Sequence, residues 1–254
     1  MSGFLRRVRD GLVPPWVVRR LFGGVLRREE MERFAGFYGG FVGEGDLCFD
    51  VGANLGNRVR AFRRLGCRVV AVEPQPSCVR ALRREFGGDE QVVVVDAAAG
   101  AAAGEAVLHV SPDHVLSSLS RRFIEGTRES GRFAASEWNR EERVRVETLD
   151  ALIAEHGVPR FLKIDVEGYE AEVVAGLSYA VPCVSYEWTP ELPELAADTA
   201  RRLAGLGDYR FNISWGESLR LAREDWLPLE RMLEVIDLMA GDRWLFGDIY
   251  ARIE

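Results

Sequence analysis

The feature that most constrains the fold is a regular alternation of short apolar segments with helical stretches between residues 47 and 96. Leu47–Val51, Arg68–Glu73 and Gln91–Asp96 have the apolar character of buried strands, and helices are predicted from Leu55 to Leu65 and from Ser77 to Phe86. Buried strands that alternate with helices are typical of a parallel sheet covered by helices on both faces. The sequence therefore predicts an α/β fold.

The remainder of the chain continues this pattern after a polar interruption. Residues 111–142 are polar and rich in arginine, and we expect a long functional loop there, with room for one helix. Residues 214–247 carry no motif that identifies a ligand. The predicted strands are Glu105–Val110 (a hairpin arm), Arg143–Val146, Phe161–Val166, Cys183–Glu187, Tyr209–Ile213 and Asp248–Ile253, and the predicted helices are Leu149–His156, Tyr169–Leu177 and Leu195–Leu206.

Length and composition limit the class of protein. A chain of 254 residues suits one large domain with a modest extension. Glycine breaks near residue 44 separate an expected N-terminal helical extension, residues 1–44, from a catalytic body, residues 45–254. No apolar run approaches the roughly 20 residues that a membrane helix needs, and no secretory signal is recognisable. We therefore expect a cytoplasmic protein.

The charge balance limits the partners. A net charge of -7 argues against nucleic-acid binding, which depends on neutralising phosphates. Residues 1–28 nevertheless hold seven arginines and one aspartate, and residues 15–22 are amphipathic. Such a segment packs on the catalytic body or on a second subunit more often than on a membrane surface. A homodimer is therefore one alternative for this segment, and a peripheral membrane contact is the less favoured one. The four cysteines have no paired spacing and indicate neither zinc nor disulfides.

A glycine-bearing turn follows the first predicted strand. Asp50-Val-Gly-Ala-Asn-Leu-Gly56 opens the next helix, at the place where an α/β sheet brings backbone amides to a ligand. Its G-x-N-x-G pattern differs from the dinucleotide pattern G-x-G-x-x-G, and Asp50 suits a cationic amino-acid group better than a pyrophosphate. Glu73 ends the second strand about 20 residues on, where an acid commonly binds ribose hydroxyls. These residues favour S-adenosylmethionine over a nicotinamide cofactor.

The second motif surrounds the only lysine. Of 33 basic residues all but Lys163 are arginine, which indicates a position where a compact point charge is required. Strand alternation places Lys163 and Asp165 on one face as neighbours. They could form a buried ion pair that fixes the strand end, or lie beside the transferred group. A carboxylate partner raises a lysine pKa, so we expect Lys163 to position groups rather than to act as the general base.

Together these motifs resemble the FkbM family of S-adenosylmethionine-dependent methyltransferases. The similarity runs from about Asp46 to Glu187 and rests on Asp50 to Gly56, Glu73-Pro74, Thr148-Leu-Asp150 and Lys163-Ile-Asp-Val-Glu-Gly-x-Glu170. It implies a Rossmann-like class I methyltransferase fold, a seven-stranded mostly parallel sheet with helices on both faces and an antiparallel last strand. Members methylate mainly hydroxyl oxygens. One departure is Asp96, where the family often has asparagine; an aspartate still accepts a hydrogen bond from an adenine amino group.

The positions of these residues and the resemblance together give the expected site residues. Glu167 and Glu170 continue the lysine motif into a helix start, where negative charge also caps the helix dipole. His114 lies in the loop expected to cover the site, and Glu187 ends the next strand. The expected catalytic residues are Lys163, Asp165, Glu167, Glu170, His114 and Glu187. The expected cofactor-binding residues are Asp50, Gly52, Ala53, Asn54, Gly56, Asn57, Glu73, Pro74, Asp96, Ala97, Ser118 and Asp165.

The expected activity is O-methylation of a small hydroxylated molecule, either a secondary metabolite or a carbohydrate. N-methylation and a non-catalytic cofactor-binding subunit are the alternatives. We expect no metal, although Asp165, Glu167 and Glu187 offer the oxygen ligands that magnesium prefers. Residues that shape the acceptor pocket cannot be identified from the motifs.

Overall fold

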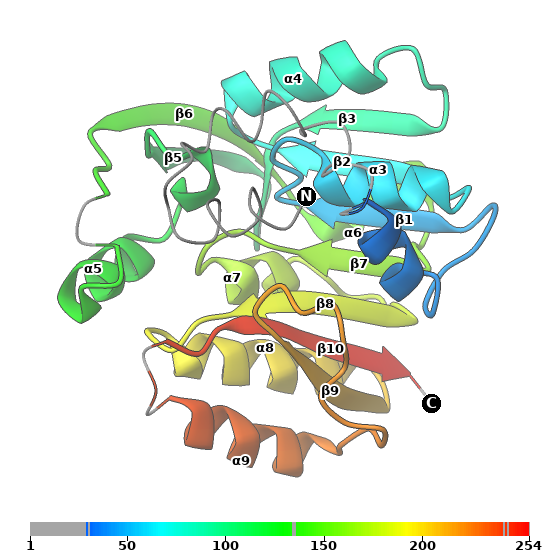
Figure 1. Cartoon of the computed structure of the whole chain (residues 1–254). Helices are drawn as coiled ribbons and strands as arrows, with labels where there is room; N and C mark the ends of the chain where they lie inside the picture. Colours follow the sequence, from blue (N-terminus) through cyan, green and yellow to red (C-terminus); the bar gives the residue numbers. More distant parts are fainter. Residues whose placement is uncertain (1–28, 30, 134–135, 241, 243, 254) are drawn as a thin grey trace, which may run out of the picture.

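A seven-stranded sheet runs through the centre of the computed structural model (Figure 1). The structure describes residues 29, 31–133, 136–240, 242 and 244–253. Most of the predicted N-terminal extension, including the amphipathic residues 15–22, lies outside the described residues. Residues 31–38 of that extension are helical. Among the described helices none is long and apolar enough to cross a membrane.

The strand order of the sheet is β3-β2-β1-β7-β8-β10-β9. Every neighbouring pair is parallel except those of β10, which runs antiparallel to both β8 and β9. The predicted seven-stranded, mostly parallel sheet with an antiparallel last strand is therefore confirmed. The strands are β1 (Leu47–Val51), β2 (Arg68–Glu73), β3 (Val92–Asp96), β7 (Phe161–Ile164), β8 (Cys183–Trp188), β9 (Tyr209–Trp215) and β10 (Gly247–Ile253).

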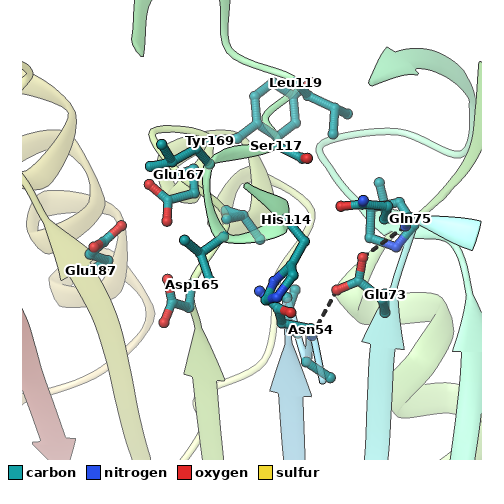
Figure 2. Close-up of a pocket in the computed structure, with 18 of the residues that line it drawn as sticks. Asn54, Glu73, Gln75, His114, Ser117, Leu119, Asp165, Glu167, Tyr169 and Glu187 are labelled. Atoms are coloured by element: carbon teal, nitrogen blue, oxygen red, sulfur yellow. Dashed lines mark hydrogen bonds between the residues drawn. The ribbon is translucent and has the colours of Figure 1, made fainter. Parts of the chain in front are cut away.

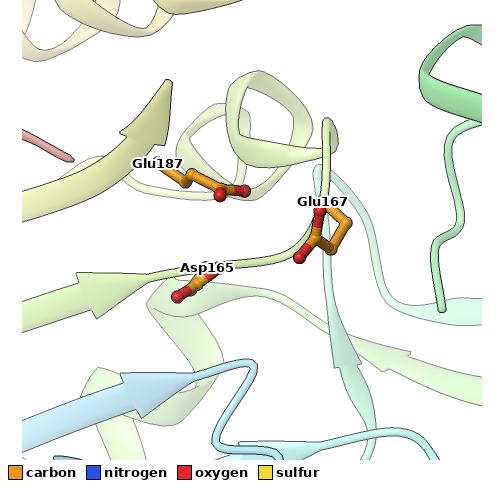
Figure 3. Close-up of side chains that lie close together, drawn as sticks. All are labelled: Asp165, Glu167 and Glu187. Carbon is orange, nitrogen blue, oxygen red and sulfur yellow. The ribbon is translucent and has the colours of Figure 1, made fainter. Parts of the chain in front are cut away.

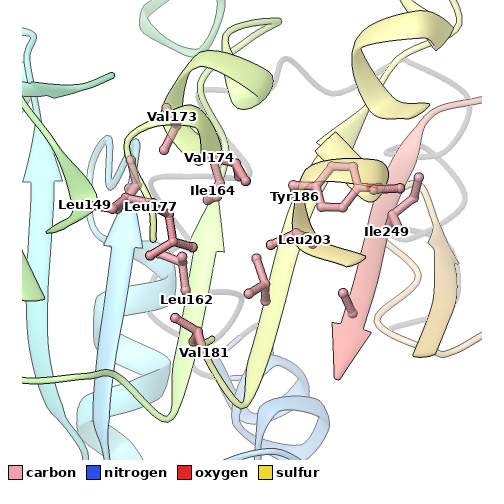
Figure 4. Close-up of a cluster of buried hydrophobic side chains, with 14 of the residues drawn as sticks. Leu149, Leu162, Ile164, Val173, Val174, Leu177, Val181, Tyr186, Leu203 and Ile249 are labelled. Carbon is pink, nitrogen blue, oxygen red and sulfur yellow. The ribbon is translucent and has the colours of Figure 1, made fainter. Parts of the chain in front are cut away.

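Helices cover both faces of the sheet. One face packs against α6 (Leu149–His156), α7 (Glu170–Ala175), α8 (Pro193–Leu206) and α9 (Leu229–Met239), and Figure 4 shows the apolar side chains between them, among them Leu162 and Val173. The other face packs against residues 31–38, α3 (Asn57–Arg64) and α4 (Pro76–Phe86) through Phe62, Leu82 and Tyr38. Burial of these apolar side chains supplies the main stabilisation of such a fold.

A second, smaller sheet stands beside the carboxyl ends of the main strands. Its order is β4-β6-β5, formed by β4 (Ala98–Ala99), β5 (Gly104–Val110) and β6 (Arg140–Glu147). Between β5 and β6 the chain forms a short 3-10 helix, η1 (His114–Leu116), and α5 (Arg121–Ser130). The expected loop of residues 111–142 therefore contains one α-helix, as predicted.

Three elements differ from the sequence prediction. The strand expected at Arg143–Val146 is twice as long, because Arg140–Glu147 pairs along the whole of β5. The strand expected to reach Val166 ends at Ile164, since the chain turns there through Glu167 with a φ of 55°. Helix α9 was not predicted; its residues Met232 and Ile236 pack on the sheet without a cap or motif to mark the helix start.

Candidate functional site

A cavity of 610 Å³ opens where β1, β2, β7 and β8 end (Figure 2). The turns after these strands line it, together with His114 from η1 and Phe246, the residue before β10. The carboxyl ends of parallel strands are the usual position of a ligand in an open α/β sheet. The cavity therefore lies where the fold predicts a binding site.

The turn after β1 forms the floor of the cavity. Asp50 is 2% exposed, and its Oδ2 has no hydrogen-bond partner among the described residues. Burial raises the pKa of Asp50 to about 6, although Arg58 and Lys163 act in the opposite direction. A buried, unpaired carboxyl oxygen is costly unless a ligand completes its hydrogen bonding. Asp50 thus fits a cationic or hydrogen-bonding ligand group.

Gly52 allows the ends of β1 and β7 to approach closely. Its φ is +84°, and a Cβ placed there would lie 1.8 Å from the backbone oxygen of Asp165. Glycine is therefore required at this position by both backbone conformation and space. The contact brings the turn after β1 against the segment that carries Asp165.

Glu73 closes the turn from the end of β2. Its Oε2 accepts a hydrogen bond from the Asn54 backbone N–H at 2.8 Å, and its Oε1 accepts one from the Gln75 backbone N–H at 2.7 Å (Figure 2). Burial raises the pKa of Glu73 to about 7, against the effect of these two hydrogen bonds. Each carboxylate oxygen retains a second lone pair that can accept from ribose hydroxyls.

The other expected cofactor residues divide into two groups. Ala53, Asn57, Pro74 and Ala97 line the cavity, whereas Gly56, Asp96 and Ser118 are not among the described residues that line it.

The three residues outside the lining have other contacts. Gly56 faces Phe86 and Leu82 and lets α3 pack closely on α4. Asp96 lies 3.4 Å from Arg83 with nearly half of its side chain exposed. The Ser118 hydroxyl donates a hydrogen bond to the Glu167 carbonyl at 2.7 Å, so Ser118 supports the turn that carries Glu167.

Lys163 is fully buried beneath the site. Its ammonium lies 2.8 Å from Asp248 Oδ1 and 3.3 Å from Asp165 Oδ2, which confirms the predicted proximity to Asp165. Lys163 is not among the described residues that line the cavity. It therefore contacts the cavity through Asp165, as the predicted buried ion pair; its predicted place beside the transferred group stays a prediction.

Three carboxylates face one another in the cavity where β7 and β8 end. Asp165, Glu167 and Glu187 each have a ligand oxygen within 4.8 Å of the others (Figure 3). This spacing is short enough for one shared cation or for shared protons. The Glu187 Oε2 atom is buried and has no hydrogen-bond partner in the part of the chain that the structure describes.

The three carboxyl groups differ in how easily they ionise. Burial and the neighbouring acids, Asp165 among them, raise the pKa of Glu167 and of Glu187 well above the ordinary value. Burial acts on Asp165 too, but Lys163 and Arg58 outweigh it and hold the pKa of Asp165 below its usual range. The site therefore joins one carboxyl group that ionises readily, Asp165, to two whose ionisation is disfavoured.

Glu170 and His114 have different surroundings. The Glu170 carboxylate accepts hydrogen bonds from the backbone N–H groups of Val166 (3.1 Å) and Gly168 (3.3 Å), and Glu170 is not among the described residues lining the main cavity. It holds the turn between β7 and α7. His114 lines the cavity near Asn54 (Figure 2), and its Nδ1 is buried without a partner among the described residues.

Several cavity residues were not identified from the sequence. Arg58 contacts Asp165 at 3.8 Å and Glu217 at 3.2 Å. Arg132 pairs with Glu191 at 3.3 Å and lies 4.7 Å from the centre of the Phe246 ring. None of these residues lies in a motif, and Arg58 is one of 32 arginines, so only the folded chain distinguishes them.

Comparisons with known proteins identify the family of the chain. The family model described as "Methyltransferase FkbM domain" matches residues 50–208, more than half of the chain. No curated protein matches the chain. A precorrin-6Y C5,15-methyltransferase from Geobacter metallireducens is similar in structure, with 11% identity, a TM-score of 0.45, and coverage of 90% of this chain and 86% of that one.

A second similar structure is a TehB-like SAM-dependent methyltransferase from Corynebacterium glutamicum, with 7% identity, a TM-score of 0.43 and coverage of 87% of each chain. The family match spans both motifs, from Asp50 near the end of β1 to the lysine segment and β8. The chain belongs to the FkbM family of S-adenosylmethionine-dependent methyltransferases.

Proposed function

We propose that the chain transfers a methyl group from S-adenosylmethionine to a hydroxyl oxygen of a small molecule, a secondary metabolite or a carbohydrate. The observation that carries this proposal is the ionised Asp165 at the acceptor end of the cavity, next to Glu167 and Glu187. An alcohol is a weak nucleophile whose proton must be accepted as the new bond forms. A fixed carboxylate with neighbouring carboxyls supplies the group that accepts this proton.

N-methylation is less favoured by the same arrangement. An amine must lose its proton before its lone pair can attack. Carboxylates close to an ammonium stabilise the charged form and raise its pKa. The acidic acceptor end would therefore hold an amine in its unreactive form. A non-catalytic subunit is also disfavoured, because the residues of both family motifs are intact.

The cofactor half of the cavity suits S-adenosylmethionine, whose sulfonium supplies an activated methyl group when bound. We propose that Asp50 faces its cationic amino-acid group and that Glu73 accepts hydrogen bonds from its ribose hydroxyls. Gly52, Ala53, Asn54, Asn57, Pro74 and Ala97 would complete the contacts, with Gly56, Asp96 and Ser118 acting through the elements that they hold.

In the acceptor half each residue has a proposed task. Asp165 orients the hydroxyl and, as the ionised carboxylate of the three, accepts its proton while the new carbon–oxygen bond forms; Glu167 and Glu187 lie beside it as hydrogen-bonding neighbours. Lys163 keeps Asp165 ionised, Glu170 holds the turn, and His114 covers the cavity from η1. Alignment of the oxygen with the methyl group contributes most where the transferred group is already activated.

Product analysis tests the proposal. The protein would be incubated with S-adenosylmethionine carrying a deuterated methyl group and a panel of hydroxylated and amino acceptors, and the products analysed by mass spectrometry. We expect the label on oxygen in a hydroxylated acceptor. Label on nitrogen alone would overturn the O-methyl assignment while leaving the family assignment intact.

Cofactor affinity is expected to fall as the pH decreases. The pKa of Glu73 in the cofactor-free protein is raised to about 7, and only its charged form binds ribose hydroxyls strongly. Protonation between pH 8 and pH 6 should therefore raise the Kd for S-adenosylmethionine roughly tenfold. Calorimetric titration at the two pH values measures this change. Glu73→Gln should bind more weakly with a smaller pH dependence, and an equally steep dependence in that variant would exclude Glu73 as the titrating group.

Chelation is expected to leave activity intact. Asp165 already pairs with Lys163 and lies near Arg58, so protein cations compensate its charge without a metal. Methyl transfer after treatment with EDTA should remain within about twofold of the untreated rate, because the methyl acceptor does not have to bind through a magnesium ion. An activity that is lost with EDTA and restored by magnesium would show that the three carboxylates hold a metal.

We also propose a catalytic body of residues 45–254, in keeping with β1 beginning at Leu47, and a cytoplasmic location. The possible homodimer and the less favoured membrane contact stay predictions, since they depend on residues outside the described part of the chain.

A further inference from the structure

Asp248 touches the catalytic segment from outside the matched family region. It lies on β10, beyond residues 50–208, and its Oδ1 accepts the shortest contact of the Lys163 ammonium, at 2.8 Å. Its side chain is 13% exposed, and Asp248 is not among the described residues that line the cavity. Asp248 therefore acts on the site only through another residue.

The sheet register explains how Lys163 reaches Asp248. Lys163 on β7 is paired with Ser185 on β8, and Ser185 is paired with Tyr250 on β10. Two residues nearer the cavity, Glu187 is paired with Asp248. The small, fully buried Ser185 leaves space for the lysine side chain to cross β8, and its hydroxyl has no partner among the described residues. Strand pairing thus fixes Asp248 within reach of the ammonium.

Asp165 and Asp248 share one cation. Lys163 lies closer to Asp248 than to Asp165, by 2.8 Å against 3.3 Å, and Arg58 approaches the same Asp165 oxygen, Oδ2, at 3.8 Å. The contacts of both cations with Asp165 are therefore at Oδ2. Without Asp248 the ammonium would move toward its one remaining carboxylate.

We propose that Asp248 is a positioning residue for methyl transfer: it holds the Lys163 ammonium between β7 and β10, so that Asp165 is kept ionised but is not drawn fully into the ion pair. This role rests on the proposed function of Asp165 as the group that orients the acceptor hydroxyl. It adds to the site a residue that lies outside the family match.

The surroundings of Lys163 define what Asp248 contributes. Burial favours the neutral amine, but Asp165 and Asp248 outweigh it and raise the pKa of Lys163 above the ordinary lysine value. If Asp248 is neutral, Asp165 is the one close carboxylate that still raises the pKa of Lys163, and the positive charge of Arg58 still lowers it. The titratable and charged groups that act on Lys163 or are influenced by it are Asp50 from β1, Asp165 and Glu167 after β7, Glu187 from β8, Asp248 from β10, Arg58 from α3 and Tyr38 from the helical residues 31–38. Tyr250 from β10 donates a hydrogen bond to Asp248 Oδ2 at 3.4 Å.

The single lysine allows a direct test. Protein grown with lysine labelled with carbon-13 at Cε gives one side-chain NMR resonance, that of Lys163, whose chemical shift reports the protonation of its amine. We expect the wild-type resonance to stay that of the charged form up to pH ~10, and the Asp248→Asn resonance to titrate at least one pH unit lower. Asp225→Asn is the matched control, because Asp225 forms an exposed pair with Arg223 and should leave the resonance unchanged.

Kinetics supply the second readout. Asp248→Asn should lower kcat about 10- to 100-fold by misplacing Asp165, and the Kd for S-adenosylmethionine should stay near that of the wild type. Asp248→Glu keeps the charge and should keep Lys163 protonated at pH ~10, even if Asp248→Asn does not fold.

Two results would overturn the proposal. One is a Lys163 resonance that titrates identically in Asp248→Asn and the wild type. The other is titration of Lys163 below pH ~9 in the wild type or in Asp248→Glu. The NMR titration requires neither an acceptor nor methyl transfer, so its failure is distinguishable from failure of the proposed function.

Discussion

Asp165→Asn is expected to reduce kcat by about 10²- to 10³-fold while cofactor affinity changes by no more than a few-fold. Asparagine has nearly the same shape as aspartate, so the packing after β7 should be kept. What is lost is the negative charge that faces the cavity and that Lys163 and Arg58 stabilise. The acceptor hydroxyl would then have no permanently ionised group to orient it.

Initial rates with labelled S-adenosylmethionine measure this effect, and calorimetry measures cofactor binding separately. Asp198→Asn is the control, because Asp198 is an exposed residue on α8 that pairs with Arg201 at 2.9 Å, away from the cavity. If Asp165→Asn turned over at the wild-type rate, Asp165 would not orient the acceptor, and Glu167 and Glu187 would have to do so without it.

Gly52→Ala is expected to abolish detectable cofactor binding and to destabilise the fold by about 2–4 kcal/mol. An alanine Cβ would lie 1.8 Å from the Asp165 backbone oxygen, and a distance that short cannot be relieved by a side-chain rotation. The turn after β1 would have to move away from β7. Asp50 and Asp165 would then no longer face the same cavity.

Gly45→Ala separates the clash from the backbone strain. Gly45 has the same φ of +84° as Gly52, but a Cβ at Gly45 has nothing within 4 Å. Both variants bear the left-handed backbone cost of about 1–2 kcal/mol, and only Gly52→Ala adds the contact with Asp165. Thermal unfolding and calorimetric titration of the two variants should therefore differ sharply. Equal cofactor binding by both would mean that the close approach of β1 and β7 is not needed.

Much of the fold could be predicted because its strands are buried on both faces. Segments such as residues 47–49 and 69–72 are apolar throughout, so they are conspicuous in the sequence and their order fixes the parallel sheet. Helix α9 was not predicted, because residues 214–247 have neither a recognisable cap nor a motif and the helix is held by tertiary packing of Met232 and Ile236.

The site was predictable only where its residues are consecutive. Asp50 to Gly56 and Lys163 to Glu170 each follow one strand, so a short motif contains them. Asp248 lies 85 residues after Lys163, and Arg132 meets Glu191 across 59 residues. Such pairs are made by strand order and loop packing, and no local pattern marks them.

The rarity of lysine has a physical explanation in the structure. Lys163 is 0% exposed, and its ammonium lies between two carboxylates. A compact ammonium on a thin stem fits such a space, whereas the broad planar guanidinium of arginine would have to displace one of them. The sequence could indicate that a point charge was required there, but not that Asp248 was its closest partner.

The most direct test of the central claim is a calorimetric titration of the unmodified chain with S-adenosylmethionine at pH 8. The arrangement of Asp50, Gly52 and Glu73 around the cavity predicts saturable binding at one site per chain, weakened by Glu73→Gln and lost in Gly52→Ala. The absence of binding by the unmodified chain, or unchanged binding by both variants, would contradict the assignment of this cavity to the cofactor.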